Sequence, residues 1–342
     1  MRVARSKHVT VVYNPVKVDL GRLRRAVERS VWPGAKVTWF ATSTEDPGYA
    51  QASRALEEGS DLIVAAGGDG TVRMVALAVS GSQVPMAIVP AGTGNMLARN
   101  LGIPLALEPA VRRAFSGQGR VTDLCRAELT YPDGCTEQSG FAVMAGVGVD
   151  AGMIHRTRES LKAAVGPLAY VPAVFQSLGG GNSVRVSITL DDAHPVTTDL
   201  HTCICGNFSE LVGHIPLLPD ARPDDGLLNA VILRAEDAAD WAGIGGKLVL
   251  DTVRGGVRAL ASGGGADGAS PSPRTMQYID GRSLALEFAE PEELELDGDA
   301  AGAVTAVRFE VDPGAFRVVC LARAPAAGGR GEGAQWLHDL QL

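Results

Sequence analysis

The chain has 342 residues, nearly half of them apolar, which is enough for two domains with buried cores. Its formal net charge of −8 argues against general nucleic-acid binding, which requires a basic face. Five cysteines without Cys-x-x-Cys spacing argue against a disulfide framework or a zinc site. No stretch approaches the roughly 20 apolar residues of a membrane-spanning helix.

The beginning of the chain is basic. Its first apolar run, VTVVY, is too short for a signal peptide, so we expect a protein of the reducing cytoplasm. Eight Lys or Arg residues fall within the first thirty positions: Arg2, Arg5, Lys7, Lys17, Arg22, Arg24, Arg25 and Arg29. They form either a solvated helix face or a surface that meets phosphate groups or anionic lipids.

Short strands and helices alternate through the first third of the chain. The patterns predict strands over 8–13, 36–42, 61–66 and 85–90, and helices over 20–30, 48–59, 71–80 and 95–102. Such alternation predicts a parallel sheet covered by helices on both faces, and ligands bind at the carboxyl ends of the strands of such sheets. That edge is expected to carry Asn14, Thr42, the Gly67–Thr71 turn and the Ala91–Asn95 turn.

From about Val121 the pattern changes to strand-like alternation with turn residues between the strands. Strands are predicted over 120–130, 139–150, 183–192, 195–207, 227–235, 282–290 and 303–311. This predicts an antiparallel, β-rich second domain, a sandwich. Two helical stretches near 168–178 and 238–253 interrupt it, and 261–273 is typical of a flexible loop.

The first glycine-rich turn consists of Gly67, Gly68, Asp69, Gly70 and Thr71. Glycines let the backbone approach a polyphosphate, and the N-terminus of the helix that follows favours anions. Asp69 would then hold a metal-bound phosphate or orient a ribose. The alternative is an ordinary turn, in which Asp69 and Thr71 only cap the helix.

The second turn repeats this design one strand later, with Thr93 between Gly92 and Gly94, and with Asn95 placed to cap the next helix. A cap is again the simpler alternative. Two such turns on neighbouring strands predict the two sides of one phosphate-binding site.

GGDGT followed by PAGTGN resembles the catalytic domain of the bacterial diacylglycerol kinase family, relatives of sphingosine and ceramide kinases. NAD kinases and phosphofructokinases share GGDG but are not expected to pair it with PAGTGN. The resemblance covers nearly the whole chain. Asn14-Pro15 is similar to the family's first nucleotide loop, although Val16-Lys17-Val18 replaces its small, Gly-rich continuation. Thr42 is similar to a threonine that contacts ATP.

The resemblance implies an ATP-dependent lipid kinase that transfers the γ-phosphoryl group to the hydroxyl of diacylglycerol or a similar lipid, giving phosphatidic acid. Mg²⁺ would bridge the phosphates of ATP. The nucleotide would lie across Asn14, Pro15, Thr42, Gly67, Gly68, Asp69, Gly70, Thr71, Thr93, Gly94 and Asn95.

The segment LELDGDA (294–300) stands where the family has Asp-Gly-Glu. By resemblance Asp299 takes the place of the proton acceptor, normally Glu, which is one methylene longer. Asp297 would support it or help to hold catalytic Mg²⁺. Side chains two apart in an extended segment share a side, so both carboxylates would face one cleft. The alternative is a solvated turn in an acidic loop.

The segment 206–233 resembles the family's most recognisable later region. By resemblance Asp225 would ligate a second Mg²⁺ through its side chain, and Arg222 and Leu227 would add carbonyl oxygens. Such a site would order the region between the domains without taking part in the chemistry. Spacing alone favours a plain Asp-Asp-Gly turn, although its oxygens suit a hard cation.

We therefore expect an ATP-binding α/β domain over 1–125, completed by about 305–325, a lipid-binding domain over 126–304, and a flexible tail over 326–342. The enzyme would meet its lipid peripherally at the inner face of the membrane, and a homodimer is left open. Three alternatives also stay open: a sphingoid-base or ceramide kinase, an NAD kinase-like enzyme with a soluble substrate, and a catalytically weak nucleotide or lipid sensor.

Overall fold

The computed structural model describes residues 7–148, 183–211, 215–234, 240, 243–244 and 275–321. Four predicted features lie outside these residues, apart from positions 240, 243 and 244: the helical stretches near 168–178 and 238–253, the loop 261–273 and the tail 326–342. Among the helices of the described residues, none is long and apolar enough to cross a membrane.

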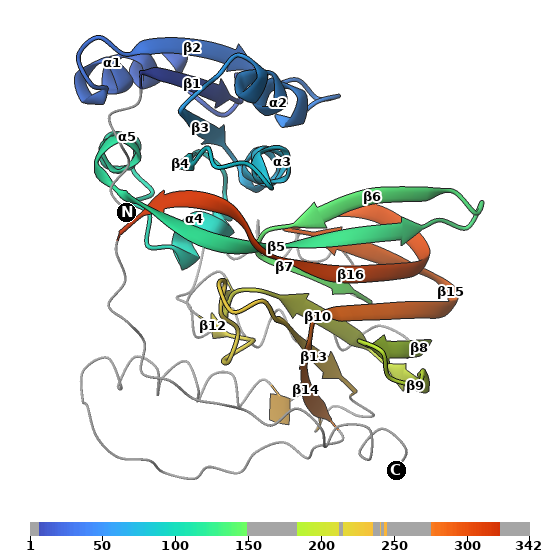
Figure 1. The fold of residues 1–342 in the computed structure, drawn as a ribbon. Coiled ribbons are helices and arrows are strands. Elements are labelled where there is room, and N and C mark those ends of the chain that lie inside the picture. Colours follow the sequence, from blue (N-terminus) through green and yellow to red (C-terminus); the bar gives the residue numbers. More distant parts are fainter. Residues whose placement is uncertain are drawn as a thin grey trace, which may run out of the picture.

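The N-terminal region contains the predicted parallel sheet. Its strands are β1 (His8–Tyr13), β2 (Lys36–Ala41), β3 (Leu62–Gly67) and β4 (Met86–Pro90). They lie side by side in the order β2-β1-β3-β4, and every neighbouring pair is parallel (Figure 1). Strands β3 and β4 are buried along their whole length, as their continuous apolar sequences predict.

Helices cover both faces of this sheet. They are α1 (Leu20–Ser30), α2 (Tyr49–Glu57), α3 (Asp69–Val79), α4 (Met96–Asn100) and α5 (Leu107–Ser116). Because side chains alternate along a strand, Val11 and Val64 join one core with α1 and α5, whereas Val12 and Ile63 join a second core with α2, α3 and α4. The prediction of an α/β region is confirmed.

Helix α5 was not predicted from the sequence. Pro109 lies at its third position, where the N–H that proline lacks would have no partner within the helix. Its apolar face, which includes Val111 and Phe115, packs in the same core as α1. A proline in the first turn therefore does not prevent this helix.

The rest of the described chain is β-rich and antiparallel, as predicted. Its strands are β5 (Gln118–Thr130), β6 (Thr136–Phe141), β7 (Met144–Val147), β8 (Val184–Leu190), β9 (Val196–Leu200), β10 (Thr202–Gly206), β11 (Glu210–Leu211), β12 (Ile215–Pro216), β13 (Leu228–Leu233), β14 (Met276–Gly281), β15 (Ser283–Leu296) and β16 (Asp299–Cys320). Strand β14 was not predicted. The core of this region includes Phe141 and Phe309, whose rings meet edge to face at 5.5 Å.

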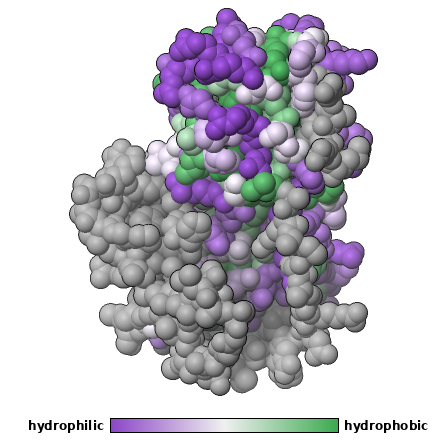
Figure 2. Space-filling model, turned by 90° about the vertical axis from the view of Figure 1, so that its left-hand side faces the viewer, coloured by the Kyte–Doolittle hydropathy of each residue, from purple (hydrophilic) through white to green (hydrophobic). Residues whose placement is uncertain are grey.

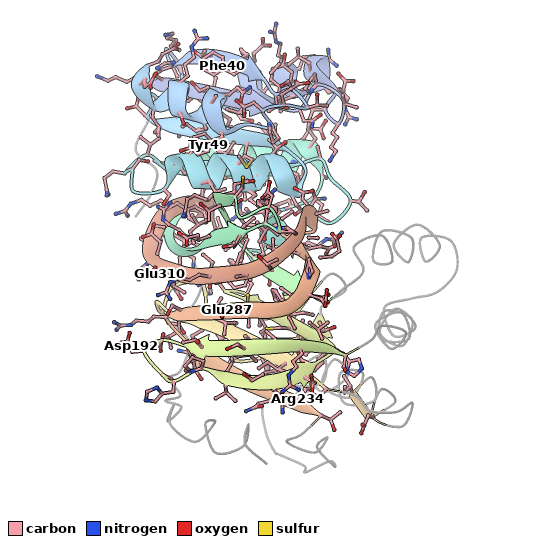
Figure 3. All side chains as sticks on the ribbon, turned by 90° about the vertical axis from the view of Figure 1, so that its right-hand side faces the viewer. Phe40, Tyr49, Asp192, Arg234, Glu287 and Glu310 are labelled. Carbon is pink, nitrogen blue, oxygen red and sulfur yellow. The ribbon has the colours of Figure 1, made fainter. Side chains whose placement is uncertain are left out.

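One sheet runs through both regions, because β16 belongs to each. This long strand pairs with β15 and β5, and near its end Val318 pairs in parallel with Met86 of β4. Figure 3 labels Glu287 on β15 and Glu310 on β16, the two long curved strands below the N-terminal layers. The division of the chain into two domains near residue 125 stays a prediction.

The basic residues of α1 lie on its exposed face, but several of them contact other parts of the protein. Arg22 forms an ion pair with Glu108 of α5 at 3.0 Å, and the Arg24 guanidinium lies 5.3 Å from the ring centroid of Trp39. Figure 2 faces the α1 and α5 side of the molecule and shows a largely hydrophilic surface over this region. Exposed contacts of this kind contribute little stability. An anion in solution can therefore replace them, and the arginines of α1 remain accessible.

Candidate nucleotide and phosphoryl-transfer site

The carboxyl ends of the four parallel strands are aligned. Tyr13 pairs with Ala41 and with Ala66, and Gly67 pairs with Pro90. The ladder continues one residue further through backbone bonds, in which the N–H groups of Asn14, Thr42 and Ala91 donate at 2.9, 2.9 and 2.8 Å. The loops that follow the strands therefore meet at one edge of the sheet.

Other side chains lie close to all three glycines of the first turn. A Cβ atom on Gly67 would lie 2.6 Å from Cβ of Thr71, and one on Gly68 would lie 2.8 Å from Nζ of Lys17. A Cβ on Gly70 would lie 2.5 Å from Oδ2 of Asp299. A side chain at Gly67 would collide with Thr71, whereas at Gly68 and Gly70 only the flexible ends of Lys17 and Asp299 would have to move.

Asp69 joins the two glycine-rich turns. Its two carboxylate oxygens accept hydrogen bonds from the backbone N–H groups of Asn95, at 2.8 Å, and of Met96. Asp69 therefore caps α4, the helix after the second turn. The carboxylate also suits the N-terminal end of the α4 dipole.

Asn95 does not cap α4 as the sequence predicted. It adopts a left-handed conformation with φ of 50°, and its side chain turns back to Gly92. Oδ1 accepts from the Gly92 N–H at 2.8 Å, while Nδ2 donates to the Gly92 carbonyl at 2.7 Å. Asn95 thus closes the second turn, and Asp69 supplies the cap.

The other residues expected at the nucleotide lie around these turns. The Asn14 side chain accepts N–H bonds from Val16 and Lys17 at 3.0 and 3.1 Å, which folds the loop after β1 into a tight turn. The Thr42 hydroxyl is buried and has no hydrogen-bond partner among the described residues. Thr93 is exposed at the tip of the second turn. A buried hydroxyl without a partner is costly, and a ligand that bonded the Thr42 hydroxyl would remove that cost.

Asp299 is brought to the first turn from the far end of the chain. Its side chain, 49% exposed, forms an ion pair with Arg73 of α3, in which Oδ2 lies 3.2 Å from the guanidinium Nη2. The Arg73 side chain is only 13% exposed, and its Nε has no partner in the described part of the chain. Asp299 is therefore held above Gly70 yet is open to solvent on its other side.

Asp297 does not share a cleft with Asp299, contrary to the sequence prediction. Asp297 and Gly298 have φ of 51° and 84°, so a left-handed turn interrupts the extended segment and its alternation. Asp297 is buried, and its carboxylate accepts the backbone N–H groups of the β6–β7 turn, at Ala142, Val143 and Met144. Burial raises its pKa to about 6, although these N–H groups and Arg73 act in the opposite direction.

The predicted second metal site lies in a loop bound to β5. Asp225 accepts the Leu227 N–H at 3.1 Å, and burial together with the charge of Asp123 raises the pKa of Asp225. Asp123 itself accepts the N–H groups of Gly226 and Gly314, each at 2.7 Å. In the described part of the chain, no group of three or more His, Cys, Asp or Glu residues could hold a metal ion.

A cavity of about 580 Å³ lies beside Arg73. It is lined by residues of α2, α3, the β5–β6 hairpin and the segment around Ala300. Tyr49, labelled in Figure 3 at the start of α2, contributes to its wall. The cavity gives a space between the N-terminal layers and the long strands, next to the Arg73–Asp299 pair.

Sequence reasoning missed two of these residues. Arg73 follows the GGDGT motif by two positions, where a helical pattern reads simply as a helix face. Lys17 was noted as one of the basic residues near the start of the chain and as a departure from the family's first loop, but not as a neighbour of the glycine-rich turns. The position of Lys17 against Gly68 depends on a contact between loops that the sequence does not state.

Comparison with known proteins finds similarity to diacylglycerol kinases. Residues 8–127 match the model of the diacylglycerol kinase catalytic domain. The diacylglycerol kinase of Staphylococcus saprophyticus is 25% identical over 304 residues, which cover 86% of this chain and 90% of that protein. The diacylglycerol kinase of Staphylococcus epidermidis is 26% identical over 305 residues, covering 88% of each. A solved structure of a diacylglycerol kinase from Bacillus anthracis str. Sterne has the same fold, with a TM-score of 0.63 at 19% identity over 93% of this chain and 98% of that one.

The fold and the matched domain define the class of this protein, which is that of the lipid kinases. Residues 8–127 match the diacylglycerol kinase catalytic domain, and the relatives that the chain resembles are bacterial diacylglycerol kinases, in line with the resemblance of its two glycine-rich turns. The match counts against the NAD kinase-like alternative.

Proposed function

We propose that this enzyme transfers the γ-phosphoryl group of ATP to the hydroxyl of diacylglycerol or a similar lipid, giving phosphatidic acid and ADP. One observation carries the proposal. Asp69 ties the two glycine-rich turns together, while Asp299, from the other region of the chain, lies directly over Gly70. A backbone that can receive phosphates and a carboxylate that can accept a proton are thus neighbours.

In this proposal Asp299 accepts the proton of the lipid hydroxyl. The hydroxyl oxygen attacks the γ-phosphorus in line, and the bond from that phosphorus to the oxygen of ADP breaks. About half of the Asp299 side chain is exposed, so a lipid hydroxyl can reach it. Arg73 limits its movement, which matters because a displacement of about 1 Å can be costly to catalysis.

Mg²⁺ would supply positive charge near the phosphates as the transfer proceeds. Asp299, which is half exposed, offers the hard oxygen donors that this ion prefers. Each Asp69 oxygen already accepts one backbone N–H and could add a second contact, whereas the buried Asp297 carboxylate accepts three. A second, structural ion would be held by the Asp225 carboxylate with the carbonyl oxygens of Arg222 and Leu227. The carboxylate of Asp123 lies close enough for its charge to act on Asp225, and a cation there would offset the repulsion between the two.

Access to the lipid requires contact with a membrane. We place the enzyme peripherally at the inner face, on the cytoplasmic side, with the exposed arginines of α1 facing anionic headgroups. Single basic clusters give weak and reversible attachment, which suits an enzyme that must release its product.

Transfer of label from γ-labelled ATP tests the proposal. The protein is mixed with Mg²⁺ and with vesicles that contain diacylglycerol, ceramide or sphingosine. Labelled phosphatidic acid is expected with diacylglycerol, and its loss is expected in Asp299→Ala. Asp192→Ala is the control, because Asp192 is exposed in the β8–β9 turn (Figure 3).

The same assay separates the alternatives. Product formed only on sphingosine or ceramide would assign the enzyme to the sphingoid-base and ceramide kinases. ATP binding without product on any lipid would assign a sensor. Normal turnover in Asp299→Ala would refute its role as the proton acceptor.

A further inference from the structure

Lys17 occupies a defined place beside the first glycine-rich turn. The backbone carbonyl of Asn14 accepts the Val18 N–H at 3.1 Å. The side-chain oxygen of Asn14 accepts the N–H groups of Val16 and Lys17. This short turn directs the Lys17 side chain toward β3, where a Cβ atom on Gly68 would lie 2.8 Å from Nζ. The ammonium group therefore lies almost against the Gly68 backbone.

The two glycine-rich turns meet at the same point. A Cβ atom on Gly92 would lie 2.8 Å from Cα of Gly68 and 3.6 Å from the backbone nitrogen of Asp69. A Cβ atom on Gly68 would in turn lie 3.4 Å from Cα of Gly92. The Lys17 ammonium is thus close to both backbones of the expected phosphate-binding site.

No carboxylate neutralises this ammonium within the described residues. Lys17 forms no ion pair with any of them, whereas Arg73, the other cation at the turn, is paired with Asp299. Lys17 is exposed, so a bound anion can reach it. An unpaired ammonium over a surface without side chains is suited to phosphate oxygens.

The position of Lys17 also indicates which phosphates it would meet. Gly68 and Gly70 belong to one turn, and Gly70 lies under Asp299, the proposed proton acceptor. The γ-phosphoryl group must lie near Asp299 for transfer, so the phosphates near Gly68 are the terminal ones. We propose that Lys17 binds the β- and γ-phosphates of the nucleotide and makes the site selective for nucleoside triphosphates over monophosphates. This inference rests on the proposed function.

Nucleotide titration of the full chain by calorimetry, without lipid, tests the inference. Lys17→Ala is expected to weaken ATP binding about tenfold and AMP binding less than twofold, and Lys17→Arg is expected to restore most of the loss. Lys36→Ala is the control, because Lys36 is also exposed but lies at the start of β2, away from the edge of the sheet that carries the loops. Thermal unfolding of each variant confirms that it is folded.

Three results would overturn the inference. Equal ATP affinity in wild type and Lys17→Ala would remove Lys17 from the phosphate site while leaving the proposed function intact. Equal losses for ATP and AMP would contradict a contact with the terminal phosphates. Unchanged ATP affinity together with lost sedimentation on phosphatidylglycerol vesicles would assign Lys17 to the membrane surface. Absence of ATP binding in the wild type would instead refute the proposed function.

Discussion

Replacement of Asp69 by alanine removes the two hydrogen bonds by which its carboxylate joins the first glycine-rich turn to the N-terminus of α4. Asn95 and Met96 would each lose a charged acceptor. Hydrogen bonds to charged groups contribute about 1.5–3 kcal/mol each when buried. Asp69 is only partly buried, so we expect Asp69→Ala to lower the free energy of unfolding by about 2–4 kcal/mol in total.

Asp69→Asn separates the structural loss from the loss of charge. Its remaining side-chain oxygen can still accept one of the two N–H groups, so the expected destabilisation is about half as large. Urea unfolding followed by circular dichroism measures both variants, and calorimetry measures their affinity for ATP. We expect ATP affinity to fall in both, because the second turn loses its attachment to the first.

An unchanged unfolding midpoint in Asp69→Ala would refute this reasoning. It would mean that Asp69 does not cap α4 in solution. A destabilised Asp69→Ala with unchanged ATP affinity would also contradict it, because the joined turns would then have no part in nucleotide binding.

Three further predictions follow from the same geometry. Gly68→Ala should fold normally, because Gly68 has an ordinary extended conformation and only the flexible end of Lys17 must move. Its affinity for ATP should nevertheless fall, and an unchanged affinity in a titration would be contrary evidence. Arg73→Ala should lower kcat more than it raises the KM for ATP, with partial recovery in Arg73→Lys, because Arg73 positions Asp299; a pure KM effect would argue for direct nucleotide binding. The pKa of Asp297 in the folded protein, about 6, exceeds its ordinary value of 3.8, so the folded state binds the proton more tightly than the unfolded state does. As the pH falls from 8 to below 4, the free energy of unfolding of the wild type should therefore rise by about 3 kcal/mol relative to that of Asp297→Asn. Parallel pH profiles of urea unfolding for the two proteins would contradict this.

Much of the N-terminal fold could be predicted because its signals are local. The strands β1, β3 and β4 are short apolar runs bounded by turn residues, and the glycine-rich turns follow directly. Parallel strands place their carboxyl ends at one edge, so the meeting of the loops followed from the topology alone. The capping of α4 by Asp69 could not be predicted from the sequence, because this helix begins 27 residues after Asp69.

The orientation of the two late carboxylates could not be predicted for a different reason. Alternation along an extended chain assigns Asp297 and Asp299 to one side, but the left-handed conformation at Asp297 and Gly298 reverses that relation. Asp297 then finds its partners in the β6–β7 turn, more than 150 residues away. Such partners are chosen by tertiary packing, which a single sequence does not reveal.

The central claim is that the two turns bind one triphosphate between them. Backbone amide shifts measured by NMR during titration with a non-hydrolysable ATP analogue test it most directly. The account predicts joint shifts at Gly68, Gly70, Gly92 and Gly94, saturating at one equivalent. Shifts confined to one turn, or none at millimolar analogue, would contradict it.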